Sequence, residues 1–66
     1  MKLWINGQSR EFPALLTVAS LVEALGYAGK RIAVECNGEI VARGRHAETV
    51  LAEGDRIEIV VAVGGG

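Results

Sequence analysis

At the start of the chain, apolar and polar residues alternate around the dipeptide Asn6-Gly7. Leu3 and Ile5 stand two positions apart before the dipeptide, which is typical of a strand with one buried face. Asn-Gly is favoured in a type I′ turn because both central residues of that turn need positive φ angles. The pattern predicts a β-hairpin, and Pro13 ends its second strand because proline has no N–H to donate to a neighbouring strand.

The spacing of apolar residues changes to that of a helix after Thr17. One helical face is formed by Val18, Leu21, Val22 and Leu25. Thr17 is placed to cap the N-terminus, because its hydroxyl oxygen can accept a hydrogen bond from a free backbone N–H of the first turn. Gly26 follows directly and predicts the end of the helix. Since this helix is short and apolar on one side, it must lie on a sheet.

Alternation returns over residues 32–36 and predicts a third strand, with one buried face. A second Asn-Gly pair, Asn37-Gly38, predicts a turn into a short return strand over residues 39–41. The polar stretch that follows predicts a connecting loop with a helical turn near Ala47.

The last strand is predicted over residues 56–62, after a turn at Gly54-Asp55. It becomes apolar on both faces at Val60 and Val61, as a central strand does. The order hairpin, helix, hairpin, strand predicts an α+β domain with one main helix packed on one face of a mixed sheet. A right-handed crossover favours the first and last strands side by side in its middle. The predicted core comprises Leu3, Ile5, Val18, Leu21, Val22, Leu25, Val34, Cys36, Ile57 and Ile59.

Length, charge and cysteine content narrow the class of function. The chain of 66 residues predicts one domain, and its single cysteine cannot form an intramolecular disulfide. The net charge of -1, with both signs interspersed, argues against a nucleic-acid partner, because phosphate binding needs a concentrated basic face. No apolar run reaches membrane-spanning length and no signal-peptide pattern begins the chain, so we interpret the protein as soluble and cytoplasmic, with no membrane partner.

Conventional active-site patterns are missing from the sequence. Gly29-Lys30 superficially resembles a phosphate-binding loop, but the glycine spacing is short and Arg31 replaces the Ser or Thr that would bind magnesium. One histidine and one cysteine are too few ligands for a zinc site of the usual kind. Cys36 and His46 are either a nucleophile with its base, or a buried apolar thiol and a loop histidine. The inward parity of Cys36 favours the second interpretation.

Trp4 has the opposite parity to its apolar neighbours. We therefore predict that it lies on the sheet face away from the helix, together with Val60 and Ala62. An exposed aromatic side chain beside valine is typical of a docking patch. A lone tryptophan covered by neighbouring side chains is the alternative, since single apolar residues at the surface are common.

The chain ends in Gly64, Gly65 and Gly66, which bury no side chain and lose much backbone entropy on ordering. These glycines are either a frayed end or a narrow, flexible segment without Cβ atoms that carries the terminal carboxylate into a narrow active site. We assign residues 1–63 to the domain and residues 64–66 to a flexible tail.

These features in this order, with the ending Val63-Gly64-Gly65-Gly66, resemble the ThiS family over the whole chain. This family comprises the sulfur carriers of bacterial thiamine biosynthesis. The resemblance implies a ubiquitin-like β-grasp fold with about five strands, in which the first and last strands are parallel and central.

The resemblance also implies the chemistry of the tail. In the family, a ThiF-like (E1-like) adenylating enzyme uses ATP to convert the terminal glycine carboxylate into an acyl-adenylate. Sulfur from a donor then gives a thiocarboxylate, which supplies a ThiG-like thiazole synthase. By analogy Gly66 is the modified residue, and Gly64 and Gly65 thread into the partner active sites. The implied partner interface comprises Trp4, Val60, Ala62 and Val63. The chain is then a monomeric co-substrate, not an enzyme, and itself holds no cofactor or metal.

Other carriers share such a tail. The small subunit of molybdopterin synthase is the nearest in chemistry, although its chains are usually longer and end in a double glycine after a serine. A sulfur carrier for tRNA thiolation and a ubiquitin-like protein modifier are further alternatives. A plain β-grasp interaction module with incidental glycines belongs to a different class, and it would tolerate the loss of Gly65 and Gly66.

Overall fold

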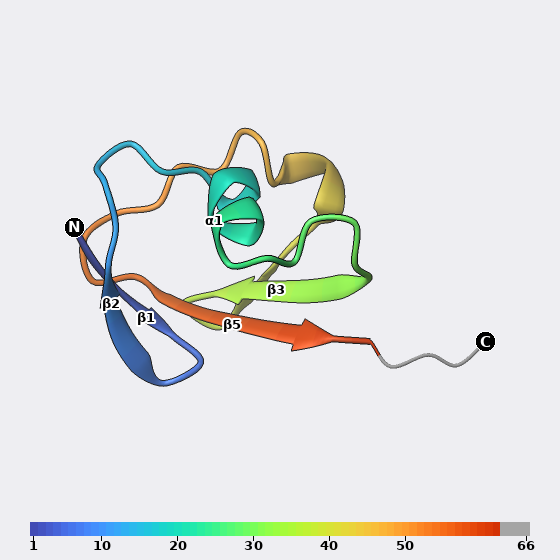
Figure 1. Cartoon of the computed structure of the whole chain (residues 1–66), viewed down its shortest axis with the longest axis horizontal. Helices are drawn as coiled ribbons and strands as arrows, with labels where there is room; N and C mark the ends of the chain where they lie inside the picture. The colour runs from blue at the N-terminus through green and yellow to red at the C-terminus, as the bar shows by residue number, and fades with distance from the viewer. Residues whose placement is uncertain (63–66) are drawn as a thin grey trace.

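In a computed structural model of the chain, which describes residues 1–62, five strands form one mixed sheet in the order β2-β1-β5-β3-β4. A single α-helix of the described chain lies on one face of this sheet (Figure 1). The elements are β1 Lys2–Ile5, β2 Gln8–Glu11, α1 Val18–Ala24, β3 Ile32–Cys36, β4 Glu39–Val41, the 3₁₀ helix η1 Arg43–Arg45 and β5 Arg56–Val61. This arrangement confirms the predicted α+β, β-grasp architecture.

Both predicted hairpins form, and both turn at an Asn-Gly pair. In the β1–β2 turn, Asn6 and Gly7 have φ angles of 50° and 84°. In the β3–β4 turn, Asn37 and Gly38 have φ angles of 53° and 86°. Two successive positive φ angles are the property of a type I′ turn that the sequence predicted. The local sequence therefore decided where each hairpin turns.

The two chain-terminal strands lie side by side and parallel, as predicted. Ile5 of β1 is opposite Ile57 of β5, and β5 pairs on its other side with β3, antiparallel, with Val34 opposite Ile59. The last strand is thus the middle strand of the sheet. Since both neighbours of β5 come from distant parts of the sequence, its position depends on the whole fold.

Helix α1 begins and ends at the predicted residues. The Thr17 hydroxyl oxygen accepts a hydrogen bond from Ser20 N at 3.1 Å and caps the N-terminus. At the other end Leu25 is the C-cap, and Gly26 follows with a φ angle of 84°, the left-handed conformation that commonly stops a helix. With 7 residues and a rise of about 1.5 Å per residue, the helix is only about 10 Å long.

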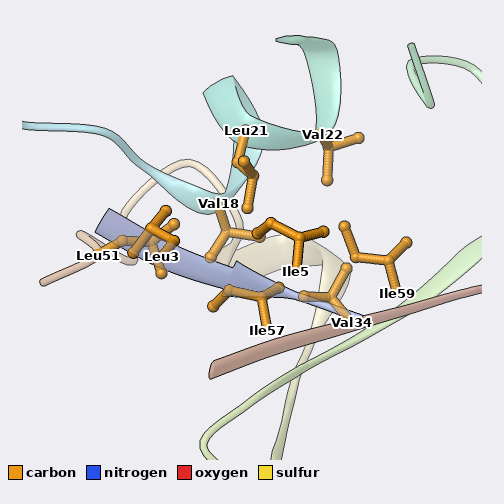
Figure 2. Packing of buried hydrophobic residues seen from close by; sticks show 9 residues of the cluster. All are labelled: Leu3, Ile5, Val18, Leu21, Val22, Val34, Leu51, Ile57 and Ile59. Carbon is orange, nitrogen blue, oxygen red and sulfur yellow. The ribbon is translucent and has the colours of Figure 1, made fainter. Parts of the chain in front are cut away.

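The core lies between helix α1 and the sheet (Figure 2). Its buried residues are Leu3, Ile5, Val18, Leu21, Val22, Val34, Leu51, Ile57 and Ile59. Two predicted members, Leu25 and Cys36, are only half-buried and pack against this cluster. Both stand at the end of their element, where fewer neighbours cover a side chain. These two residues therefore contribute to the predicted core from its margin.

Leu51 belongs to the core although the sequence did not predict it. Its side chain is 4 % exposed, and it lies outside any helix or strand that could show a periodic pattern. Leu51 N donates to Leu16 O at 2.8 Å, next to an isolated bridge between Thr17 and Val50. This contact ties the segment before β5 to the start of the helix, and so closes one end of the core.

The connecting loop contains its helical turn slightly earlier than predicted, at Arg43–Arg45 rather than near Ala47. His46 follows this turn, and its Nε2 atom lies 3.1 Å from Val41 O. Its own carbonyl accepts from Ala19 N at 3.0 Å, which joins the loop to helix α1. These two contacts fix the position of the turn.

No helix within residues 1–62 combines the length and hydropathy needed to cross a bilayer.

Candidate functional site

Strand β5 leads the chain toward the predicted reacting end. The last described backbone hydrogen bond of this strand runs from Ala62 N to Arg31 O, at 2.9 Å. The predicted modified residue Gly66, the threading residues Gly64 and Gly65, and the interface residue Val63 lie outside the described residues. Their roles remain predictions, while the structure does show what surrounds the strand that precedes them.

The sheet face away from the helix carries Trp4, Val60 and Ala62, as the parity of the sequence predicted. Trp4 is 40 % exposed and Val60 is 62 % exposed. The strand register places Trp4 of β1 opposite Arg56 of β5, and Val60 is four residues further along β5. At about 3.3 Å per residue this is about 13 Å, so the two side chains share a face without forming one compact cluster.

A charged position separates the two ends of this outer face. Glu58 stands between Arg56 and Val60 on β5 with the same parity, and the register places Glu35 of β3 opposite it. A shallow hollow of about 300 Å³ lies beside the tryptophan, lined by Trp4, Gly7, Arg56, Ile57 and Glu58. The Trp4 end of the outer face therefore combines an aromatic surface with charges of both signs, whereas the Val60 end is apolar.

The C-terminal end of β5 is exposed on both of its faces. Val61 has the parity of the buried isoleucines of β5 but is 40 % exposed, and Val60 on the opposite face is 62 % exposed. The sequence predicted a central strand that is apolar on both faces here; β5 is the middle strand of the sheet, but the side chains of its last two residues are exposed. Helix α1 is about 10 Å long, whereas the 6 residues of β5 span about 20 Å, so the helix covers only part of the strand. Figure 1 shows β5 continuing past the helix.

Cys36 and His46 contact different groups. Asn37 Nδ2 lies 3.7 Å from the Cys36 sulfur, whereas the His46 ring contacts the carbonyl of Val41. Partial burial raises the pKa of the Cys36 thiol, and the nearby carboxylate of Asp55 raises it further. A nucleophilic cysteine needs a lowered pKa. This thiol therefore lacks the activation that a catalytic pair would provide.

The described residues do not bring together three or more His, Cys, Asp or Glu side chains at metal-binding distances. Among residues 1–62, the features suited to contact are structural: the end of a middle strand that extends past the helix, the exposed valines of that end, and an aromatic residue on the outer face. Such an arrangement is suited to contact with another protein.

Comparisons with known proteins agree with this description. The model of the ThiS family matches residues 3–66. The chain is similar to a solved thiamine biosynthesis protein (ThiS) from Geobacter metallireducens, with 33% identity, a TM-score of 0.86 and full coverage of both chains. A solution structure of a thiamine biosynthesis protein from the same organism matches with a TM-score of 0.82 and 33% identity, over 100% of this chain and 88% of that one.

Two curated relatives are longer proteins. The whole chain is 46% identical to part of a protein called thiazole synthase from Paramagnetospirillum magneticum, and 41% identical to part of another from Magnetococcus marinus. The chain spans 20% of the length of each of these relatives. The family match covers nearly all of the sequence, and a solved member of the family matches at 33% identity. The chain therefore belongs to the ThiS family.

Proposed function

We propose that the chain is a sulfur carrier for thiamine biosynthesis, and that the carboxylate of Gly66 is the group that carries the sulfur. The observation that supports this most directly is the family match, which continues through the glycines to residue 66. A match of the β-grasp domain alone would support the fold. The family match also includes the terminal glycines, which have no side chains to bury in a core, and this supports the proposed chemistry at the terminal carboxylate.

The proposed chemistry follows from the properties of a carboxylate. With a pKa of about 3.5 it is ionised at neutral pH and is a poor electrophile. A ThiF-like adenylating enzyme would use ATP to form an acyl-adenylate and release pyrophosphate. The terminal sulfur of a donor persulfide would attack the acyl carbon, AMP would leave, and a thiol would reduce the resulting acyl disulfide to the thiocarboxylate. The chain is then a co-substrate that contributes no catalytic side chain.

The proposed acceptor of the sulfur is a ThiG-like thiazole synthase. Its support comes from the two relatives called thiazole synthase, because a segment similar to this whole chain occurs within each of them. Domains that share one polypeptide in some organisms commonly act together. We place the docking surface on the outer sheet face and the exposed end of β5, with Trp4, Val60, Ala62 and Val63 as its residues.

The mass of the intact protein tests this function. The full-length protein is incubated with ATP, the adenylating enzyme of its host and a sulfur donor. The expected result is an increase that matches replacement of one oxygen by sulfur, located at Gly66 by fragmentation. A variant that lacks Gly65 and Gly66 is the control and must stay unchanged. If the mass of the intact chain also stays unchanged, while the enzyme is shown to be active, the carrier function is wrong.

Use in thiamine biosynthesis is tested separately, by offering the thiocarboxylate form to a thiazole synthase and to the large subunit of a molybdopterin synthase. Loss of the sulfur to the thiazole synthase is expected. Transfer to the molybdopterin enzyme alone would contradict the assigned pathway but leave the carrier chemistry in place.

A further inference from the structure

One edge of β5 becomes open before the strand ends. Strand β1 pairs with β5 only at the Trp4–Arg56 and Ile5–Ile57 positions, after which the chain turns away at the β1–β2 hairpin. Figure 1 shows β5 extending well past this hairpin while β3 still accompanies it on the other side. The sheet therefore has an additional edge in its interior, along the last part of its middle strand.

The side chain of Asn6 occupies the first position of this edge. Its backbone N donates to Ile57 O at 2.9 Å, which is the last backbone hydrogen bond from the hairpin. Its side-chain amide then pairs with the next backbone groups on this edge: Ile59 N donates to Asn6 Oδ1 at 2.8 Å, and Asn6 Nδ2 donates to Ile59 O at 3.3 Å. The amide thus replaces a strand residue and satisfies both backbone groups of Ile59.

The next backbone groups on this edge belong to Val61. In the antiparallel β3–β5 ladder, Asn37 N donates to Arg56 O and Ala62 N donates to Arg31 O. Alternate residues of a strand bond to opposite sides, so the even-numbered residues of β5 bond toward β3. The N–H and C=O of Val61 therefore point to the open side, where no group of residues 1–62 pairs with them.

The outer edges of the sheet are protected in ways that this inner edge is not. All four residues of edge strand β2 are exposed and polar, and they include Arg10 and Glu11. Edge strand β4 has only 3 residues. Charge and brevity are common means of preventing edge-to-edge pairing. By contrast, the open edge of β5 is flanked by the exposed side chains of Val60 and Val61, with neither a charge nor a proline there.

We infer that the open edge of β5 at Val61 is a strand-addition site, and that an extended segment of the thiazole synthase pairs with it. A backbone donor and acceptor side by side at strand spacing are matched by another extended backbone. The flanking valines add apolar contact on both faces of the added strand. This inference rests on the proposed function for the identity of the partner. It goes beyond that function in specifying main-chain pairing, with Asn6 setting where the pairing begins.

Amide hydrogen exchange tests the inference on the unmodified full-length protein. The Val61 amide should exchange rapidly in the free chain and become protected when purified thiazole synthase is bound. The Ile59 amide, which Asn6 already holds, should be protected in both states and serves as the internal reference. A Val61 amide that is protected in the free chain, or that stays unprotected in the complex, would overturn the inference.

A pair of variants separates main-chain from side-chain contact. Val61→Pro removes the N–H on the open side, and it breaks no hydrogen bond between β5 and β3 because that N–H does not point toward β3. Val61→Ala keeps the N–H and shortens the side chain. Binding of thiazole synthase should be weaker by about tenfold in Val61→Pro than in Val61→Ala. Equal binding of the two variants would overturn strand addition. If Val61→Pro does not fold, the hydrogen-exchange measurement on the unmodified protein remains the test.

These outcomes are distinguishable from failure of the proposed function. If the mass of Gly66 shifts as expected and the thiazole synthase accepts the sulfur, the carrier function stands whatever the Val61 amide does. If the chain forms no complex with thiazole synthase at all, the inference and the choice of partner are both wrong.

Discussion

The side-chain amide of Asn37 and the carboxylate of Asp55 join the β3–β4 turn to the start of β5. Asn37 Nδ2 donates to Asp55 Oδ1 at 3.0 Å, and Ala52 N donates to Asp55 Oδ2 at 2.8 Å. Asn37 Oδ1 in turn accepts from Arg56 N at 2.9 Å. A turn residue and a loop residue 18 positions apart thus fix the point at which the middle strand begins.

Asp55→Asn should lower the free energy of unfolding by about 1 kcal/mol, because an amide group cannot accept both hydrogen bonds that the carboxylate accepts. Urea denaturation followed by circular dichroism measures the change. Glu48→Gln is the matched control, since it also removes one negative charge, from an exposed residue. An equal effect of the two substitutions would show that net charge, rather than the contact with Asn37, is responsible.

The reactivity of Cys36 should reflect its raised pKa. Partial burial and the Asp55 carboxylate both favour the neutral thiol, so alkylation should reach half its maximal rate at a higher pH than for an unstructured cysteine. Asp55→Asn should move this midpoint to lower pH because the nearby charge is gone. A midpoint that Asp55→Asn leaves unchanged, in a folded variant, would contradict the assigned electrostatic contribution.

The same thiol makes stability depend on pH in the alkaline range. The folded chain holds the proton of Cys36 more tightly than the unfolded chain, in which the pKa is about 8.5. The contribution of this group is therefore fully present below that pH and is lost as the pH rises through the folded-state pKa. Cys36→Ser should have a smaller decline in unfolding free energy over this range, measured by urea denaturation at several pH values.

Leu51→Ala should destabilise the domain by about 2–5 kcal/mol, because it opens a cavity at the closed end of the core. A domain of this size has about 3–5 kcal/mol available, so much of the variant should be unfolded at room temperature. Val50→Ala is the control: its side chain is 62 % exposed and should change stability by less than about 0.5 kcal/mol. Similar thermal midpoints for the two variants would mean that Leu51 contributes little to the core.

Leu15 has a backbone conformation that leucine rarely adopts. Its φ angle is 63°, and its side chain is 88 % exposed, so no burial offsets the strain. Leu15→Asn should raise the free energy of unfolding by about 1 kcal/mol, since asparagine tolerates left-handed backbone. Leu15→Val should lower it, because a β-branched side chain is disfavoured there. A stabilised Leu15→Val, measured in the same denaturation assay, would contradict this account.

Much of the fold could be predicted because its signals are local. The Asn6-Gly7 turn requires positive φ angles at adjacent residues, and the Thr17 cap requires a hydroxyl before an apolar period of helical spacing. Neither depends on distant contacts. The identity of the middle strand followed from a general rule on crossovers, applied to the order of these elements.

The candidate site was predictable only in part. Strand parity placed Trp4, Val60 and Ala62 on the outer face, because side chains alternate along any strand. Parity cannot show where a neighbouring element ends, so it did not predict the exposure of Val61, which has the parity of the buried isoleucines. That exposure depends on the length of the helix relative to β5, and on the place where the hairpin turns away.

The sequence by itself determined the type and order of the elements, the two type I′ turns and the resemblance of the glycine ending to that of a sulfur carrier. These properties arise from backbone preferences and from side-chain spacing within a few residues. The tertiary structure alone decided that Leu51 closes the core, that Asn37 and Asp55 fix the start of β5, and that the Asn6 amide pairs with Ile59 and leaves Val61 as the next open position. Each of these is a contact between residues far apart in the chain, and its geometry exists only once the strands are in register.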